Sequence, residues 1–268
     1  MFYATTLGKA FAKTCKNGDM GRVHSIFERA VNIRLEGQAG GLLTMLCSEI
    51  DILPAYLITH APGGSWGRLM QVNDSLLFTG EAIYIRNEPI IGQITQAKLW
   101  ERLSDAELTA HIKPEIDLII LGCKLAESYL SKNSPPSISF PVMPQPLNPL
   151  ELIGLGPGLT PSGDDFLAGV LHGMIFMEKL RGIKNPRLPE ITQLITNNLH
   201  KTGEISRHFL SYAVAGEWGR NTEDFLIAIT ENETRKLQNA IDRKLSIGAT
   251  SGADEIRGCI YGVLAGCR

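Results

Sequence analysis

The sequence predicts an α+β protein in which a strand-rich N-terminal half, a meander or small barrel, precedes a mainly helical C-terminal half. Three observations support this prediction. Short β-compatible runs separated by turn residues fill the first hundred positions, helical periodicity begins near residue 105, and a proline-dense segment follows. With 268 residues, the chain is long enough for one large domain or two modest ones with buried cores.

The N-terminal half consists of short apolar runs between predicted turns, which contain glycine or the pair Asn-Asp. The turns are Gly37–Gly41, Asn73-Asp74 and Gly80-Glu81. The predicted strands cover residues 22–27, 31–35, 42–46, 76–78 and 82–85. Their short length and close spacing are typical of a meander or a small barrel.

The helical half begins with residues 105–131, where apolar side chains recur at helical spacing and Pro114 predicts a kink. Six prolines follow within residues 134–149, a density incompatible with a helix or a central strand. We therefore expect a strand-rich domain with a terminal helix at 1–133, a connector at 134–149 and a helical domain at 150–268. The further predicted helices are 164–180, 188–218, 223–231, 234–245 and 252–266.

Composition excludes several classes of protein. Lys and Arg number 26 against 28 Asp and Glu, so the chain lacks the broad positive charge of a nucleic-acid or acidic-membrane binder. No apolar run is long enough to cross a membrane, and the first 20 residues lack the apolar core of a secretion signal. The five cysteines include no CxxC pair. We expect a cytoplasmic protein with reduced thiols and neither nucleic-acid nor membrane partners.

A glycine-rich loop precedes the second helical region. Residues 154–165 read Gly-Leu-Gly-Pro-Gly-Leu-Thr-Pro-Ser-Gly-Asp-Asp, which matches neither the dinucleotide fingerprint nor the P-loop. A loop of this kind that enters a helix can hold an anion on free backbone amides and hydroxyls. The predicted anion-binding residues here are Gly156, Gly158, Thr160, Ser162, Gly163 and Asp164.

The start of this helix is repeated near the C-terminus. Ser162-Gly-x-Asp165 returns as Ser251-Gly252-x-Asp254, and each copy continues with two glycines spaced by four, at 169 and 173 and at 258 and 262. Each interior glycine costs a helix about 1 kcal/mol relative to alanine, so close helix packing is the expected compensation. Two parallel helices packed along these glycines would place both N-termini at one anion-binding pocket.

A capping box explains the same Ser-x-x-Asp pattern without a ligand, and that alternative stays open. The acids Asp164, Asp165 and Asp254 would also repel an anion. Either a cation intervenes, or these acids bind the amide or amine hydrogens of a substrate.

Other candidate sites have weaker support from the sequence. Thr202 and Ser206 lie four apart next to Arg207, and such a group can bind an anion or form a solvated polar face. His200, Glu204 and His208 have metal-ligand spacing, which polar faces also produce by chance. His172 follows Asp165 by two turns and is expected in the core. Gly63–Gly67 matches the letters of a serine-hydrolase elbow, but the residues after it look extended.

The loop motif at 154–165, together with Thr202, Ser206 and the Thr250-Ser-Gly-x-Asp254 segment, resembles a bacterial family associated with anaerobic allantoin breakdown. That family, once labelled a carboxylase, forms a subunit of oxamate carbamoyltransferase. The resemblance implies purine catabolism in a complex of different subunits. The implied reaction interconverts oxamate plus carbamoyl phosphate with oxalurate plus phosphate.

Residue types suggest roles within that implied chemistry. Thr160, Ser162, Gly163, Ser251 and Gly252 would bind the anion, Asp165 and Asp254 would orient the nitrogen nucleophile or accept its proton, and Arg207 would neutralise developing charge. The Ser-Thr-Arg-Thr and His-Pro-x-Gln segments of familiar transcarbamylases are absent, so a different site is required. A magnesium requirement stays open. A non-catalytic structural or effector-binding subunit and a biotin-independent carboxylase are the alternatives.

Overall fold

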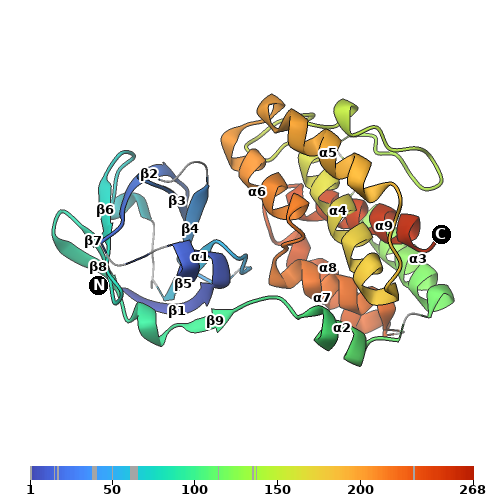
Figure 1. Cartoon of the computed structure of the whole chain (residues 1–268), viewed down its shortest axis with the longest axis horizontal. Coiled ribbons are helices and arrows are strands. Elements are labelled where there is room, and N and C mark those ends of the chain that lie inside the picture. Colours follow the sequence, from blue (N-terminus) through green and yellow to red (C-terminus); the bar gives the residue numbers. More distant parts are fainter. Residues whose placement is uncertain are drawn as a thin grey trace. The chain divides into compact units, whose positions relative to one another are not determined.

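The computed structural model of this chain forms two compact units, residues 1–101 and 102–268 (Figure 1). It describes residues 2–14, 16, 18–37, 41–49, 51–60, 66–113, 115–134, 136, 138–231 and 233–268, without the side chains of 14, 60 and 111. Three predicted features therefore lie outside the described residues in whole or in part: the centre of the Gly37–Gly41 turn, the Pro114 kink and the elbow at 63–65.

The first unit is a small β-barrel, which confirms the predicted strand-rich half. Within the described residues, eight strands form a ring in the order β5-β4-β3-β2-β6-β7-β8-β1, and antiparallel pairing of β1 with β5 closes it. A ninth strand, β9, adds to β1 in parallel. The strands are β1 (Phe2–Gly8), β2 (Met20–Ile26), β3 (Ala30–Leu35), β4 (Leu42–Leu46), β5 (Tyr56–His60), β6 (Ser75–Phe78), β7 (Ile83–Ile85), β8 (Glu88–Gly92) and β9 (Lys98–Trp100), with helix α1 (Lys9–Thr14) after β1.

Successive side chains along the barrel strands point alternately to a buried face and an exposed face. In β6, Leu76 and Phe78 are buried whereas Ser75 and Leu77 are exposed. Burial of these alternate side chains places the apolar core inside the ring. The largest fully buried side chains of this unit include Phe11, Ile33, Met45, Leu57, Trp66 and Phe78.

The second unit is helical. Its helices are α2 (Asp105–His111), α3 (Ile116–Asn133), α4 (Ser162–Arg181), α5 (Leu188–Asn198), α6 (Glu204–Val214), α7 (Arg220–Thr230), α8 (Thr234–Leu245) and α9 (Ser251–Gly266), with short 3₁₀ turns η3 (Pro149–Glu151) and η4 (Leu199–Lys201). The predicted helix at 188–218 is interrupted at Thr202-Gly203, because Gly203 adopts an extended conformation as the N-cap of α6. No helix in the described part of the chain is long and apolar enough to cross a membrane.

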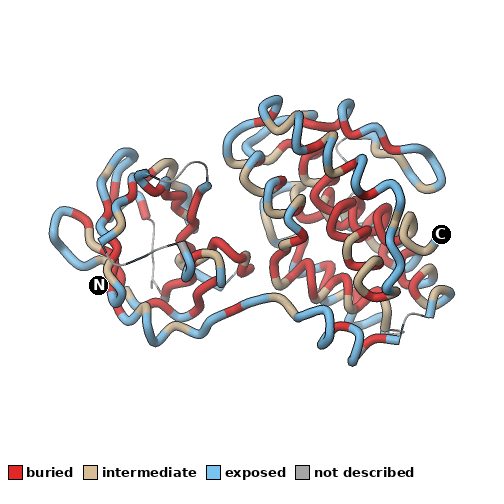
Figure 2. Tube along the Cα trace, in the orientation of Figure 1, coloured by how far each residue is buried: buried red, intermediate tan, exposed pale blue. Residues whose placement is uncertain are grey.

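Helices α4 and α9 form the centre of the helical unit, and both are buried over most of their length (Figure 2). A Cβ added to Gly169 would lie 2.0 Å from the carbonyl oxygen of Glu255, and one added to Gly262 would lie 2.3 Å from that of Val170. Contacts advance along both helices in the same direction, so the two helices run parallel with their backbones touching. The predicted packing along the repeated glycines is therefore present in the structure.

The chain divides between Glu101 and Arg102, earlier than the proline-rich connector that the sequence suggests. Helices α2 and α3 belong to the helical unit because Leu108, Ile119 and Cys123 share one apolar core with residues of α7, α8 and α9. Residues 138–149 instead contact this unit through Phe140 and Gln145.

Aromatic and polar contacts hold the proline-rich segment against α4 and α9. The ring of Phe140 stacks on Phe166, with centroids 4.5 Å apart and planes 6° apart. The Tyr261 hydroxyl donates to the carbonyl oxygen of Gln145 at 2.8 Å. These contacts explain how a segment without regular secondary structure is ordered by its neighbours.

Candidate functional site

The glycine-rich loop depends on its glycines for backbone geometry. Gly154, Gly156 and Gly158 have φ values of 74°, 114° and 96°, in a region that other residues rarely adopt. A Cβ on Gly154 would also lie 2.9 Å from the carbonyl oxygen of Lys201. The loop thus turns tightly against the backbone of Lys201 before α4 begins.

The first amides of α4 are already hydrogen-bonded within the chain. The N–H of Gly163 donates to the carbonyl oxygen of Leu155 at 2.8 Å, and the N–H groups of Asp164 and Asp165 donate to that of Pro161 at 2.9 and 3.1 Å. Gly163 is needed for packing, since a Cβ there would lie 2.0 Å from the Leu152 carbonyl oxygen. The same holds for its counterpart Gly252, where an added Cβ would lie 1.9 Å from the Lys244 carbonyl oxygen.

The two repeated helix starts meet and contact each other reciprocally. The Thr160 and Ser251 hydroxyl oxygens are 2.8 Å apart. The Ser251 hydroxyl also hydrogen-bonds to the carboxyl group of Asp165, and the Ser162 hydroxyl lies against that of Asp254. Each serine of one repeat therefore faces the aspartate of the other.

The two aspartates of the repeat differ in exposure. Asp254 is fully buried, with Arg257 Nη1 3.6 Å from its Oδ1, and both of its carboxylate oxygens lack a hydrogen bond of ordinary geometry. Asp165 is partly exposed at the edge where Thr160 and Ser251 also reach the surface. Asp165 is therefore less completely buried than Asp254, although its Oδ2 is also buried without a hydrogen bond of ordinary geometry.

Asp164 joins the loop to α6. Its Oδ1 accepts from the Gly154 N–H at 2.8 Å, and its Oδ2 accepts from the Ser206 hydroxyl at 2.6 Å and from the Thr202 hydroxyl. The predicted binding residues Thr202 and Ser206 therefore hold a buried carboxylate of the chain itself. They form a group separate from Asp165, on another face of α4.

Arg207 lies with this second group. Its Nε donates to the carbonyl oxygen of Leu199 at 3.1 Å and its Nη2 to that of Thr202 at 3.1 Å. Its guanidinium group thus caps the carbonyls at the junction of η4 and α6, and the structure does not bring it together with Asp165 and Ser251.

A buried polar cluster lies next to Asp165, and sequence reasoning missed most of it. Lys244, at the end of α8, is 4% exposed. Its ammonium group donates to Glu255 Oε2 at 2.5 Å and to the Thr222 hydroxyl at 3.1 Å. Thr222 in turn donates to Glu255 Oε1 at 2.6 Å, and His172 Nδ1 lies 3.3 Å from that oxygen.

The sequence offers a weak signal for this cluster. Glu255 occupies the position in the second repeat that Phe166 occupies in the first, so it breaks the apolar pattern at a buried turn. Lys244, by contrast, ends a strongly amphipathic helix and looks like an ordinary solvated lysine.

The surroundings of Asp165 favour its protonated form. Burial raises the pKa of Asp165 well above its usual range, and the nearby carboxylates of Glu255 and Asp254 raise it further, whereas the Ser251 hydroxyl and Lys244 act in the opposite direction. Burial also acts to raise the pKa of Glu255, but Lys244 and His172 outweigh burial and hold that pKa well below its usual range. The expected repulsion of an anion is therefore reduced, because a raised pKa favours the neutral form of Asp165 and Glu255 is paired with Lys244.

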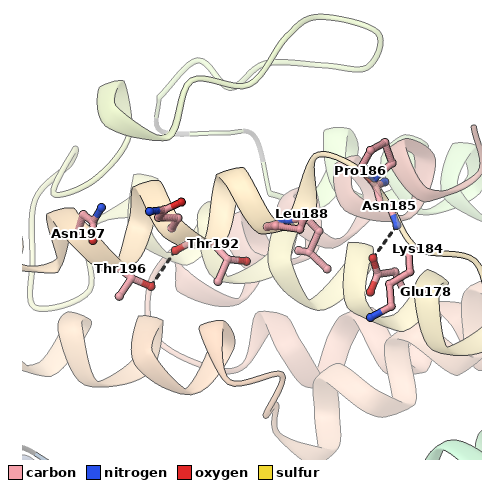
Figure 3. A pocket seen from close by; sticks show the side chains of 10 residues that line it. Glu178, Lys184, Asn185, Pro186, Leu188, Thr192, Thr196 and Asn197 are labelled. Carbon is pink, nitrogen blue, oxygen red and sulfur yellow. Dashed lines mark hydrogen bonds between the residues drawn. The ribbon is translucent and has the colours of Figure 1, made fainter.

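Two cavities lie among the described residues of the helical unit, one along α5 and one at the start of α9. A groove of about 580 Å³ follows α5 and the loop before it, where the Asn185 N–H donates to Glu178 and the Thr196 hydroxyl donates to the Thr192 carbonyl (Figure 3). A cavity of about 160 Å³ lies at the start of α9, lined in part by Ser134, Thr250 and Gly252. Gly252 is thus the predicted site residue that borders one of these two cavities.

The candidate metal ligands of the sequence are not assembled. His200 lies on η4, apart from Glu204 and His208 on α6. Burial lowers the pKa of His208 to about 4, and its ring packs edge-on against Tyr212. Among the described residues, the one group of three metal-binding side chains within mutual reach is His172, Glu255 and Cys259.

Comparisons with known families match both units. The family model described as oxamate carbamoyltransferase subunit AllH matches residues 152–263, which contain both repeats and the polar cluster. The AllH family N-terminal domain matches residues 3–107. The chain belongs to the AllH family. No solved structure matches this AllH chain. Membership identifies it as a carbamoyltransferase subunit, which implies other subunits in the same enzyme.

Proposed function

We propose that this AllH chain carries the catalytic site for interconversion of oxalurate plus phosphate with oxamate plus carbamoyl phosphate, within a complex of different subunits. The site is the shared start of α4 and α9. The observation that carries the proposal is the meeting of Thr160, Ser251 and Asp165 at a partly exposed edge, with the Lys244 ammonium group beside them. Family membership supports the reaction class.

Phosphate would bind at this edge through hydroxyls and charge. Thr160 and Ser251 supply hydroxyl donors, and Lys244 supplies a positive charge. The N-terminal ends of the parallel helices α4 and α9 add the positive ends of two helix dipoles. This arrangement favours an anion through side chains rather than through the α4 amides, which are occupied.

Asp165 would transfer the proton that the reaction requires. In the catabolic direction, a phosphate oxygen attacks the carbamoyl carbon of oxalurate, and the bond from that carbon to the amide nitrogen breaks. The departing nitrogen takes a proton from Asp165, and Asp165 regains one from phosphate, so oxamate and carbamoyl phosphate leave with protons balanced. A raised pKa suits this role, because a carboxyl group that stays protonated near neutral pH can act as the acid.

The reverse reaction uses the same residue as a base. Oxamate nitrogen attacks the carbamoyl carbon of carbamoyl phosphate, and the bond from that carbon to the phosphate oxygen breaks. Asp165 gives its proton to the phosphate, which leaves toward Lys244, and the resulting carboxylate accepts the nitrogen proton. The Lys244 ammonium group is held in place by Glu255 and Thr222, so it is preorganised for the developing phosphate charge.

Asp165→Asn in the reconstituted complex tests the proposal. We expect carbamoyl phosphate formation from oxalurate to fall at least about 100-fold, since general acid–base catalysis contributes roughly 10²–10⁴. Asp117→Asn is the matched control, because Asp117 is an exposed acid in the first turn of α3. Unchanged turnover by Asp165→Asn, with assembly intact, would assign the chemistry to another subunit. Parallel assays with and without magnesium test the metal requirement.

A further inference from the structure

Three side chains of metal-binding type meet between α4 and α9. The candidate ligand atoms of His172, Glu255 and Cys259 all lie within 4.8 Å of one another. Two come from α9, four residues apart and hence on one face of the helix, and His172 comes from α4. The group is distinct from the histidines that the sequence spacing suggests.

The repeated glycines make this meeting geometrically feasible. A Cβ added to Gly169 would lie 2.0 Å from the Glu255 carbonyl oxygen, and one added to Gly173 would lie 2.4 Å from that of Cys259. The α4 backbone thus approaches the single turn of α9 that bears Glu255 and Cys259. This short distance between the α4 and α9 backbones allows the His172 imidazole to reach the side chains of Glu255 and Cys259.

The imidazole of His172 indicates a binding site rather than ordinary core packing. His172 is 6% exposed, and both of its ring nitrogens are buried without a hydrogen bond of ordinary geometry. Its Nδ1 points toward the group, 3.3 Å from Glu255 Oε1. Buried polar groups are nearly always hydrogen-bonded or bound to a ligand; Nδ1 has Glu255 within reach, but the buried Nε2 has no partner and calls for an explanation.

We propose that His172, Glu255 and Cys259 bind one transition-metal dication of the Zn²⁺ type. Imidazole nitrogen, thiolate sulfur and carboxylate oxygen are a Zn²⁺ ligand set, and the two softer ligands disfavour Mg²⁺. Small side-chain adjustments would bring the three atoms to coordination distance. This inference does not require carbamoyl transfer, but it shares Glu255 with the proposed phosphate site.

The neighbouring residues fit an outer shell around that ion. Glu255 Oε2 accepts from Lys244 and Oε1 accepts from Thr222, so the carboxylate is oriented by two donors.

Cobalt titration of the full-length chain tests this site without any enzyme assay. We expect Co²⁺ to bind at one equivalent with a sulfur-to-cobalt charge-transfer band, and Zn²⁺ but not Mg²⁺ to displace it. Cys259→Ser should abolish the band and His172→Gln should weaken Co²⁺ binding at least about 10-fold. Cys47→Ser, which removes a cysteine of the β-barrel unit, should retain both.

The result for the unmodified chain decides the proposal even if a variant fails to fold. Absence of a charge-transfer band with Co²⁺, or a band that survives Cys259→Ser in a folded chain, would overturn it. Thermal unfolding followed by circular dichroism gives a second readout. Zn²⁺ should raise the midpoint of the unmodified chain and of Cys47→Ser but not that of His172→Gln, and an equal rise in all three would contradict the site.

Discussion

Replacement of Gly169 by alanine sets two opposing effects against each other. In an isolated helix, alanine is favoured over glycine by about 1 kcal/mol, so local propensity predicts a more stable α4. In this structure, Gly169 packs directly on the α9 backbone, and a new Cβ would lie 2.0 Å from the Glu255 carbonyl oxygen and 2.7 Å from the Cys259 nitrogen. The outcome depends on which effect is larger.

The steric effect should prevail. Ordinary contact begins at 3.4 Å, so the helices must separate by more than an ångström, and the obstructing atoms are backbone atoms that cannot rotate away. Overpacking of a core typically costs about 1–3 kcal/mol, and this contact belongs at or above the upper end. After the gain in helix propensity, we expect a net loss of about 2 kcal/mol in the free energy of unfolding. For a unit of this size, that loss lowers Tm by about 4–8 °C.

Urea and thermal unfolding followed by circular dichroism measure this loss. Gly203→Ala is the control, because Gly203 has no atom within 4 Å of an added Cβ and an unstrained backbone, so its change should stay below about 1 kcal/mol. If Gly169→Ala instead stabilised the protein by about 1 kcal/mol, propensity alone would govern the site. The backbone contact between α4 and α9 would then be refuted.

Three further substitutions test the polar groups. Asp164→Ala removes the buried acceptor of one amide and two hydroxyls and should cost about 3 kcal/mol in urea unfolding. Lys244→Met leaves Glu255 without its ammonium partner and should cost about 3–5 kcal/mol at pH 7. That cost should shrink as the pH falls below the unfolded-state pKa of Glu255, because a lowered folded-state pKa stabilises only above that value. Asp165→Asn should raise Tm at pH 7 but not at pH 3, because the raised pKa of Asp165 makes the wild type lose stability as the pH rises above 3.8. An equal change at both pH values would contradict the assigned pKa direction.

Local patterns in the sequence predict much of the fold. Short apolar runs between turn residues predict β2, β3, β4, β6 and β7, but not β1, β5, β8 or β9. Helical periodicity predicts most helices of the second unit, because such patterns arise from interactions within a few residues. The repeated Ser-Gly-x-Asp starts predict that α4 and α9 pack along their glycines, and the structure shows this packing. The same motif carries the resemblance to the family that the comparisons identify.

The sequence by itself therefore determined the two structural classes, the paired helix starts and the family. Only the tertiary structure decided the surroundings of three similar acids: Asp164 is bonded to α6, Asp254 is buried, and Asp165 is partly exposed. It alone placed Lys244 beside Glu255 and took Arg207 away from the paired helix starts. The physical reason is that the spacing of residues in the sequence determines only the face of the helix on which a side chain lies. Its charge partner and its desolvation depend on helices far away in the chain.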